Sequence, residues 1–154
     1  MADVYAIDSN LYIPALRSAK ELAALKQFLR VARRNVVVAG VVAMELRAGA
    51  PSPRHVEAVE ALLAPYAERG RVIAGSFAAH VEAGRVLAAL VEREQVVLAR
   101  APRSLTADVL LAVTCREHDA VLVTRNHQDF AAIQRHLRGF RFVGAWPTWP
   151  SGLL

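Results

Sequence analysis

The sequence predicts an α/β fold in which helices cover both faces of a central, mainly parallel sheet, giving three layers. Short apolar runs alternate along the chain with longer segments whose apolar residues recur at helical spacing. The short runs are apolar at successive positions, which is typical of strands buried on both faces. With 154 residues, 55% of them hydrophobic, the chain can fill one core. We therefore expect one domain over residues 1–146 and a short C-terminal tail over 147–154.

In the first half of the chain, each of two buried strands precedes a helical segment. The first strand ends at Asp8, and the second is β-branched and uncharged. Pro14 interrupts the stretch after the first strand, and Gly49 and Pro51 stop the last helix of this half. The expected elements are, in order, a strand at 4–7, a short broken segment at 10–15, a helix at 19–34, a strand at 35–38 and a short helix at 41–46.

The second half continues the alternation. Gly70 is a plausible helix terminator, Ser76 a helix cap, and the segment 105–117 is apolar nearly all round, as in a buried helix. The expected elements are a helix from 52 or 53 to 69, a strand at 71–74, a helix at 76–94, a loop at 95–102, a helix at 105–117, a strand at 120–123, a helix at 128–137 and a strand at 141–143. The residues expected to face inward on the 76–94 helix are Phe77, Val81, Val86, Leu87 and Leu90.

Composition narrows the class of protein. A membrane-spanning helix needs about 18 consecutive apolar residues, and every uncharged run in the sequence is shorter than that. The N-terminus lacks the pattern of a secretory signal, and the lone Cys115 cannot form an internal disulfide, so we expect a cytoplasmic protein. The net charge of +5 comes mostly from arginine, whose forked side chain suits phosphate. Nucleic acid and a general compositional bias explain this charge equally well.

Acidic side chains follow several of the predicted strands. Asp8 follows the first strand, Glu45 lies in the helix after the second, and Asn126 and Asp129 follow the strand at 120–123. Asp108 lies in the first turn of the predicted buried helix. Because ligands gather beyond the carboxyl ends of parallel strands, these positions are consistent with one site.

A hard divalent cation would offset the cost of burying such carboxylates. Asp108 and Glu45 are both framed by apolar residues, and Mg²⁺ or Mn²⁺ prefers carboxylate and water oxygens. Carboxylates holding such a metal suit phosphodiester hydrolysis. Each acid taken singly is explained as well by helix capping or by pairing with arginine. The chain has no glycine-rich nucleotide loop and no zinc-ligand spacing among its histidines.

Four segments together resemble the successive motifs of PIN-domain ribonucleases. The most specific is the strand and turn at 120–130, AVLVTRNHQDF. The other three are Asp8-Ser9-Asn10, VVAMEL at 41–46 and LTADVLLA at 105–112. The resemblance spans about residues 4–144, and size and spacing look most like the VapC-type toxins of toxin–antitoxin pairs. It implies a PIN-like α/β/α fold.

The resemblance also implies roles for individual residues. Asp8, Glu45 and Asp108 would bind the metal, and Asp129 would join them in catalysis. Asn126 stands where many members carry an acid, so either Asn126, through water, or Asp129 fills the fourth position. Ala107 also departs from the pattern, since Asn commonly precedes the third acid. Ser9, Thr106 and Asn126 would support the ligands from behind.

The implied activity is a Mg²⁺-dependent endoribonuclease, with Mn²⁺ as a possible substitute, that cuts single-stranded or loop RNA. The implied partners are an RNA substrate, a cognate antitoxin and a second copy of the chain, with no membrane. Two alternatives stay open: a catalytically idle PIN-like module that binds RNA or protein, and a housekeeping RNA-processing nuclease.

Overall fold

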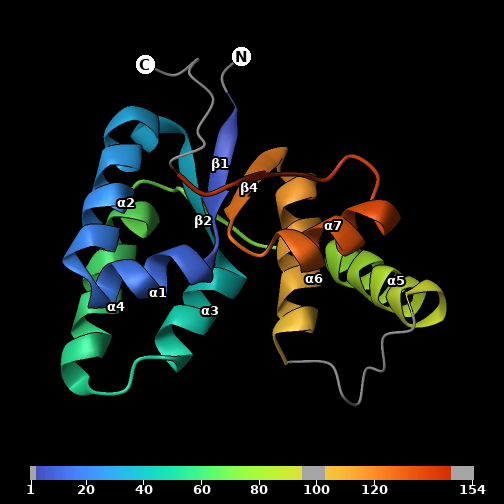
Figure 1. Cartoon of the computed structure of the whole chain (residues 1–154), viewed down its shortest axis with the longest axis horizontal. Coiled ribbons are helices and arrows are strands. Elements are labelled where there is room, and N and C mark those ends of the chain that lie inside the picture. Colours follow the sequence, from blue (N-terminus) through green and yellow to red (C-terminus); the bar gives the residue numbers. More distant parts are fainter. Residues whose placement is uncertain (1–2, 95–102, 147–154) are drawn as a thin grey trace.

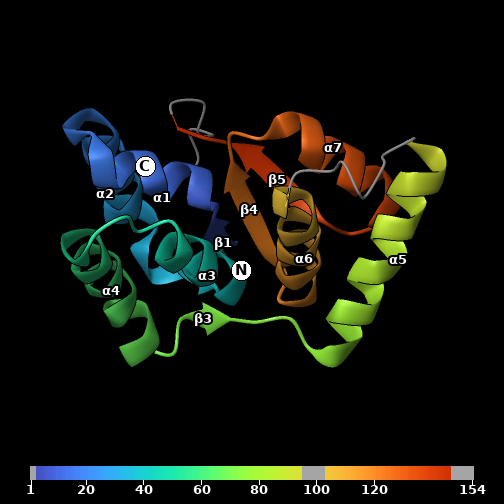
Figure 2. The same ribbon diagram turned by 90° about the horizontal axis from the view of Figure 1, so that it is seen from below.

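Within the part of the chain that the structure describes, five parallel strands form the centre of the molecule, in the order β3-β2-β1-β4-β5. The computed structural model describes residues 3–94 and 103–146. In it, α1 to α4 gather on one side and α5 to α7 on the other, with the sheet between them (Figures 1 and 2). The predicted α/β/α architecture is confirmed, and all five strands are parallel. The elements are β1 (Val4–Ile7), α1 (Ser9–Arg17), α2 (Ala19–Ala32), η1 (Arg33–Asn35), β2 (Val36–Ala39), α3 (Gly40–Ala48), α4 (Pro53–Glu68), β3 (Val72–Ile73), α5 (Phe77–Arg93), α6 (Arg103–Glu117), β4 (Ala120–Thr124), α7 (His127–His136) and β5 (Arg141–Gly144).

The predicted helix starts and stops are mostly confirmed. Ser52 caps α4, with Pro53 in its first turn, and Ser76 caps α5 by accepting a hydrogen bond from the backbone N–H of Ala79. Gly70 has φ +63°, a left-handed conformation that glycine adopts without strain. The helix α6 begins two residues before the predicted position, so Asp108 lies in its second turn and not its first.

One predicted irregular segment is a helix. Residues 10–15 lie within α1, where Pro14 is the sixth residue. Proline at this position removes one backbone hydrogen bond of the helix. Burial of Leu11, Tyr12 and Ala15, together with the packing of α1 on α2, offsets that loss.

The inward face of α5 also differs from the prediction. Phe77 and Val81 are 86% and 60% exposed, whereas Val86 and Leu90 are buried as expected. The buried stripe is completed by Ala79 and Ala83, at helical spacing from Val86. Small side chains allow α5 to pack closely on α6, and this leaves the bulky apolar residues at the start of α5 on the surface.

The end of the described chain packs on the domain. Trp146 stacks on Phe28, with ring centroids 5.1 Å apart. The predicted loop at 95–102 and tail at 147–154 lie outside the described residues. Among those that are described, no helix is both long and apolar enough to cross a membrane.

The glycines flanking and within α5 allow a test of this packing. A Cβ at position 75 would lie 3.0 Å from Thr114 Oγ1 and 3.2 Å from Ala79 Cβ, so we expect Gly75→Ala to lower the free energy of unfolding by about 1–3 kcal/mol. At Gly84, inside α5, a Cβ meets nothing within 4 Å, so Gly84→Ala should raise it by up to about 1 kcal/mol. Urea denaturation measures both. Equal effects of the two substitutions would contradict the packing described.

Candidate active site at the carboxyl edge of the sheet

Asp8 lies where β1 ends, and it is almost wholly buried, with 3% of its surface exposed. Its backbone N–H donates to the carbonyl of Val123, so the ladder between β1 and β4 holds it in place. The hydroxyl of Thr124, the last residue of β4, donates to Asp8 Oδ2 at 2.7 Å. Burial raises the pKa of Asp8, and hydrogen bonds from Thr124 and from residues 9 and 10 offset part of that rise.

Thr124 is a residue of this site that the sequence reasoning missed. Its Oγ1 accepts hydrogen bonds from the side-chain amide of Asn10 at 3.1 Å and from the backbone N–H of Asn126 at 3.0 Å. Because a hydroxyl has one proton to donate, these two donors direct that proton toward Asp8. The available signal was a polar residue, fully buried here, at the end of an otherwise apolar strand.

Asp108 extends from the second turn of α6 and is 7% exposed. Asn126 reaches it through a long hydrogen bond, 3.4 Å from Asn126 Nδ2 to Asp108 Oδ2. Burial, followed by the charges of the neighbouring carboxylates, raises the pKa of Asp108 to about 7. Those neighbours are Asp8, Glu45 and Asp129. The fold therefore brings the four predicted acids into electrostatic contact.

Asn126 also organises the fourth acid. Its Nδ2 donates to Asp129 Oδ2 at 2.9 Å, and its Oδ1 accepts from the backbone N–H of Asp129 at 3.4 Å, which caps α7. The side chain of Asn126 thus contacts two carboxylates and one helix end. Asp129 is half-buried and stands at the rim of the site.

Glu45 approaches the same place from α3. It is half-buried, and burial, with a smaller contribution from the charge of Asp8, raises its pKa. A hydrogen bond from the Ser9 hydroxyl acts in the opposite direction. Ser9 also contacts Asp8 Oδ1 at 3.4 Å, so it lies between two acids.

Thr106 does not join this network. It is exposed on α6, and no hydrogen bond links it to the site within the described parts of the chain. Two arginines that are close in sequence to the acidic motifs form ion pairs elsewhere: Arg47 with Glu60 at 3.8 Å, and Arg125 with Glu21 at 2.5 Å. Ion pairing with Arg47 therefore does not account for Glu45.

The donor set has the right chemistry for a hard divalent cation. Carboxylate oxygens and water are the ligands that Mg²⁺ and Mn²⁺ prefer, and every cause that shifts the pKa of Asp108 is one that a cation would counter. Across residues 3–94 and 103–146, however, no three Asp, Glu, His or Cys side chains are already arranged around a common metal position. The acids lie near one another without their oxygens surrounding a common point, and their metal-binding role stays a prediction.

The sequence of residues 5–135 matches the family model of the PIN domain. The chain belongs to the PIN-domain family. The match includes all four acids, and no curated protein sequence matches this PIN domain.

Several solved structures share the fold of this PIN domain. The DNA-bound VapBC of Salmonella typhimurium contains a chain that is 20% identical, with a TM-score of 0.68 and coverage of 93% of this chain and 98% of that one. VapBC2 of Rickettsia felis, bound to a promoter DNA fragment, is 18% identical, with a TM-score of 0.64 and coverage of 96% and 99%. FitAcB of Neisseria gonorrhoeae is 18% identical, with a TM-score of 0.67 and coverage of 94% and 99%.

Cys115 lies behind the acids as a core residue of the PIN domain. It is fully buried on α6, and burial, with a smaller contribution from the charge of Asp8, raises the pKa of its thiol to about 12. A thiol that keeps its proton at neutral pH is a poor nucleophile, so Cys115 serves the packing of the core.

The raised pKa of Asp108 predicts a pH-dependent stability. Between pH 3.8, its ordinary pKa, and about pH 7, the folded protein holds a proton that the unfolded chain releases. The contribution of Asp108 to the free energy of unfolding therefore falls as pH rises through this window. In EDTA, we expect Asp108→Asn to stabilise the protein by about 1–3 kcal/mol near pH 8 and by much less near pH 5.

Urea denaturation at the two pH values measures the difference. The matched control is Glu57→Gln, which removes an exposed carboxylate from α4 and should have the same small effect at both. A stabilisation by Asp108→Asn that does not change with pH would contradict the assigned pKa.

Proposed function

We propose that this PIN domain is a VapC-type toxin: a cytoplasmic, Mg²⁺-dependent endoribonuclease, with Mn²⁺ as a possible substitute, that hydrolyses phosphodiester bonds of RNA. The observation that carries the proposal is the group of four acids at the carboxyl edge of the sheet, in which burial and mutual repulsion raise the pKa of Asp108 to about 7. Such an arrangement costs stability and is expected where a cation and a phosphate bind.

Asp8, Glu45 and Asp108 would hold the metal, which when bound would lower the pKa of a water and neutralise charge at the phosphate. Thr124 positions the carboxylate of Asp8, and Ser9 lies between Asp8 and Glu45. Asp129 fills the fourth acidic position in this proposal, because the side chain of Asn126 is already engaged as a donor to Asp108 and Asp129. From the rim, Asp129 would orient the attacking water or accept its proton.

The proposed protein partner is a cognate antitoxin. The solved neighbours are described as VapBC and FitAcB assemblies, which supports a paired protein here. An antitoxin segment laid across the acids would silence them, and an arginine of that segment would pair with carboxylates that no described arginine neutralises in this chain.

Removal of single acids tests the proposed chemistry. We expect wild-type protein with Mg²⁺ or Mn²⁺ to cut RNA, and Asp8→Asn and Asp108→Asn to reduce cleavage to background, because each substitution removes a ligand charge without changing side-chain size. Gel analysis of labelled RNA measures cleavage. Glu57→Gln is the control and should cut like wild type, and EDTA should abolish cutting.

Unchanged cleavage by both variants would reject the site. Failure of the wild type to cut any RNA, with metal and without antitoxin, would favour the idle binding module. A housekeeping nuclease differs from a toxin in its gene neighbourhood, since a toxin gene should adjoin a small open reading frame for the antitoxin.

We further propose a homodimer. Phe77 and Val81 expose bulky apolar surface on the first two turns of α5, and Val72, 54% exposed, precedes them in β3. Burial of apolar side chains of this size against a partner is favourable, because it removes their surface from water.

The double variant Phe77→Glu/Val81→Glu should convert a dimer to a monomer, because it places charge at the proposed contact. Size-exclusion chromatography with light scattering measures the mass. The control is Val31→Glu, which adds charge at an exposed apolar residue of α2 and should leave the dimer intact. A monomeric wild type, or a double variant that remains dimeric, would reject the assignment.

A further inference from the structure

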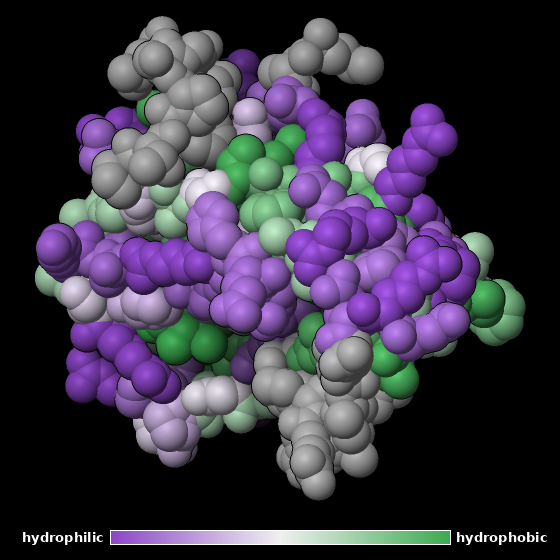
Figure 3. Space-filling view, turned by 45° about the vertical axis from the view of Figure 1, so that its right-hand side comes forward, coloured by the Kyte–Doolittle hydropathy of each residue, from purple (hydrophilic) through white to green (hydrophobic). Residues whose placement is uncertain are grey.

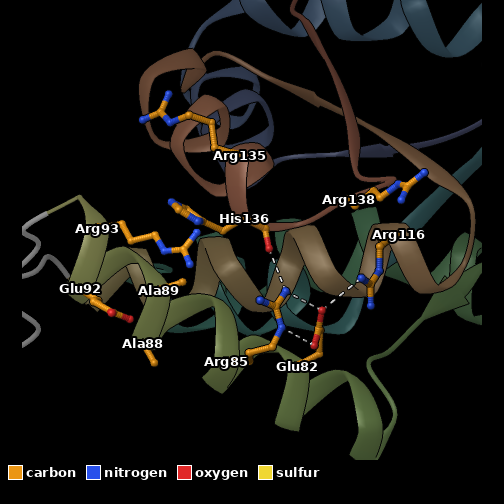
Figure 4. A pocket seen from close by; sticks show the side chains of 10 residues that line it. All are labelled: Glu82, Arg85, Ala88, Ala89, Glu92, Arg93, Arg116, Arg135, His136 and Arg138. Carbon is orange, nitrogen blue, oxygen red and sulfur yellow. Dashed lines mark hydrogen bonds and ion pairs between the residues drawn. The ribbon is translucent and has the colours of Figure 1, made fainter.

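A basic cavity lies away from the acids, where the C-terminal parts of α5, α6 and α7 meet (Figure 4). Its volume is about 540 Å³. Of the residues that the structure describes, five arginines line it, against two glutamates, Glu82 and Glu92. The arginines are Arg85, Arg93, Arg116, Arg135 and Arg138. With α5 and α7 turned toward the reader, hydrophilic side chains cover much of the middle of this face (Figure 3).

The acids in and around the cavity do not neutralise all of its arginines. Glu82 binds two of them, Arg85 at 2.8 Å and Arg116 at 3.2 Å. Glu94, just outside the cavity, binds Arg135 through both carboxylate oxygens at 2.9 Å. Arg93 and Arg138 are exposed and form no ion pair with any residue that the structure describes. The cavity therefore holds guanidinium groups that are available to an anion.

Helix ends alone do not account for this gathering of arginines. Arg93, Arg116 and Arg135 lie in the last turns of their helices, where a cation contributes about 0.3–1 kcal/mol. Arg85 is in the middle of α5, and Arg138 lies beyond the end of α7. Both line the same cavity, and Arg85 ties α5 to α7 by donating to the carbonyl of His136 at 2.8 Å.

The cavity and the acids share two helices. On α6, Asp108 and Arg116 are eight residues apart, which is about 12 Å along the helix axis. On α7, Asp129 lies in the first turn and Arg135 in the last. A flexible polyanion with one phosphate at the acids can reach the cavity with a short length of chain.

We propose that this cavity binds backbone phosphates of the same RNA strand whose scissile phosphate lies at the acids, an inference that rests on the proposed ribonuclease function. Arginine forks match phosphate oxygens in pairs. Apart from the arginines and the two glutamates, the described lining residues are Ala88, Ala89 and His136, and none of them is a Phe, Tyr or Trp on which bases stack. The cavity would therefore contribute affinity without reading the RNA sequence.

Charge reversal tests the proposal. The binding variant is Arg93→Glu/Arg138→Glu, and the matched control is Arg30→Glu/Arg54→Glu, which reverses two exposed arginines on α2 and α4 and changes the net charge equally. Fluorescence anisotropy with a labelled single-stranded RNA of about 20 nucleotides, in EDTA to prevent cutting, measures Kd. Urea denaturation checks that both variants are folded.

At about 50 mM salt we expect the binding variant to weaken RNA affinity by about tenfold or more, and the control by less than about threefold. The slope of log K against log salt should fall by about 1.4 for two lost phosphate contacts on a single strand. Equal losses in the two double variants would overturn the proposal. So would equal or tighter binding of a poly-glutamate peptide of the same charge, which would assign the cavity to an acidic protein segment.

The RNA-binding test of the cavity and the cleavage test of the proposed nuclease can fail independently of each other. RNA that binds through Arg93 and Arg138 but is never cut with Mg²⁺ or Mn²⁺ would reject the nuclease and leave a phosphate-binding cavity. RNA that is cut normally while both double variants bind equally would keep the nuclease and reject the cavity.

Discussion

The parallel pairing of β1 with β4 determines where the chemistry of this PIN domain lies. Ile7 is level with Val123 in that pairing, so the residues that follow, Asp8 and Thr124, emerge together at the same edge. The 2.7 Å hydrogen bond between them joins the two strand ends through side chains. Asn10 and Asn126 both bind Thr124 Oγ1, and Asn126 then reaches Asp108 and Asp129. A shift of this register by one residue would separate Asp8 and Asn10 from Thr124.

The electrostatics of the molecule divide into two regions. Four acids lie at one edge of the sheet, where burial disfavours the charge of Asp8, Glu45 and Asp108 and the neighbouring carboxylates further disfavour that of Asp108. The net charge of +5 comes mostly from arginines, several of which pair with other acids or line the cavity. Arg47 and Arg125 form ion pairs with Glu60 and Glu21, which are not among the four acids. Five other arginines of the described chain line the cavity between α5, α6 and α7. Repulsion among the acids lowers stability in the absence of a cation, and this is the form of strain expected at a site that binds one. The same separation would let a basic surface attract RNA while an acidic edge acts on it.

The sequence predicted the parts of this structure that depend on local pattern. All five strands appear within about a residue or two of their expected positions because each is a short apolar run with a clear end. The acids were predicted as a group because Asp8 and Asp129 follow strands whose carboxyl ends share an edge, while Glu45 and Asp108 lie in helices among apolar residues. Three features could not be predicted from the sequence, because tertiary packing determines them. Proline argued against α1, yet buried Leu11 and Tyr12 stabilise that helix. Side-chain size suggested that Phe77 faces inward, yet small alanines do so. The role of Thr124 depends on a partner 116 residues away.

We predict that the four acids form the binding site for a divalent cation. The most direct measurement is the anomalous scattering of Mn²⁺ in crystals of the protein grown near neutral pH. We expect an anomalous peak in contact with carboxylate oxygens of Asp8 and Asp108, and its loss in crystals of Asp108→Asn. Crystals that show no peak at these acids, or a peak that persists unchanged in Asp108→Asn, would contradict it.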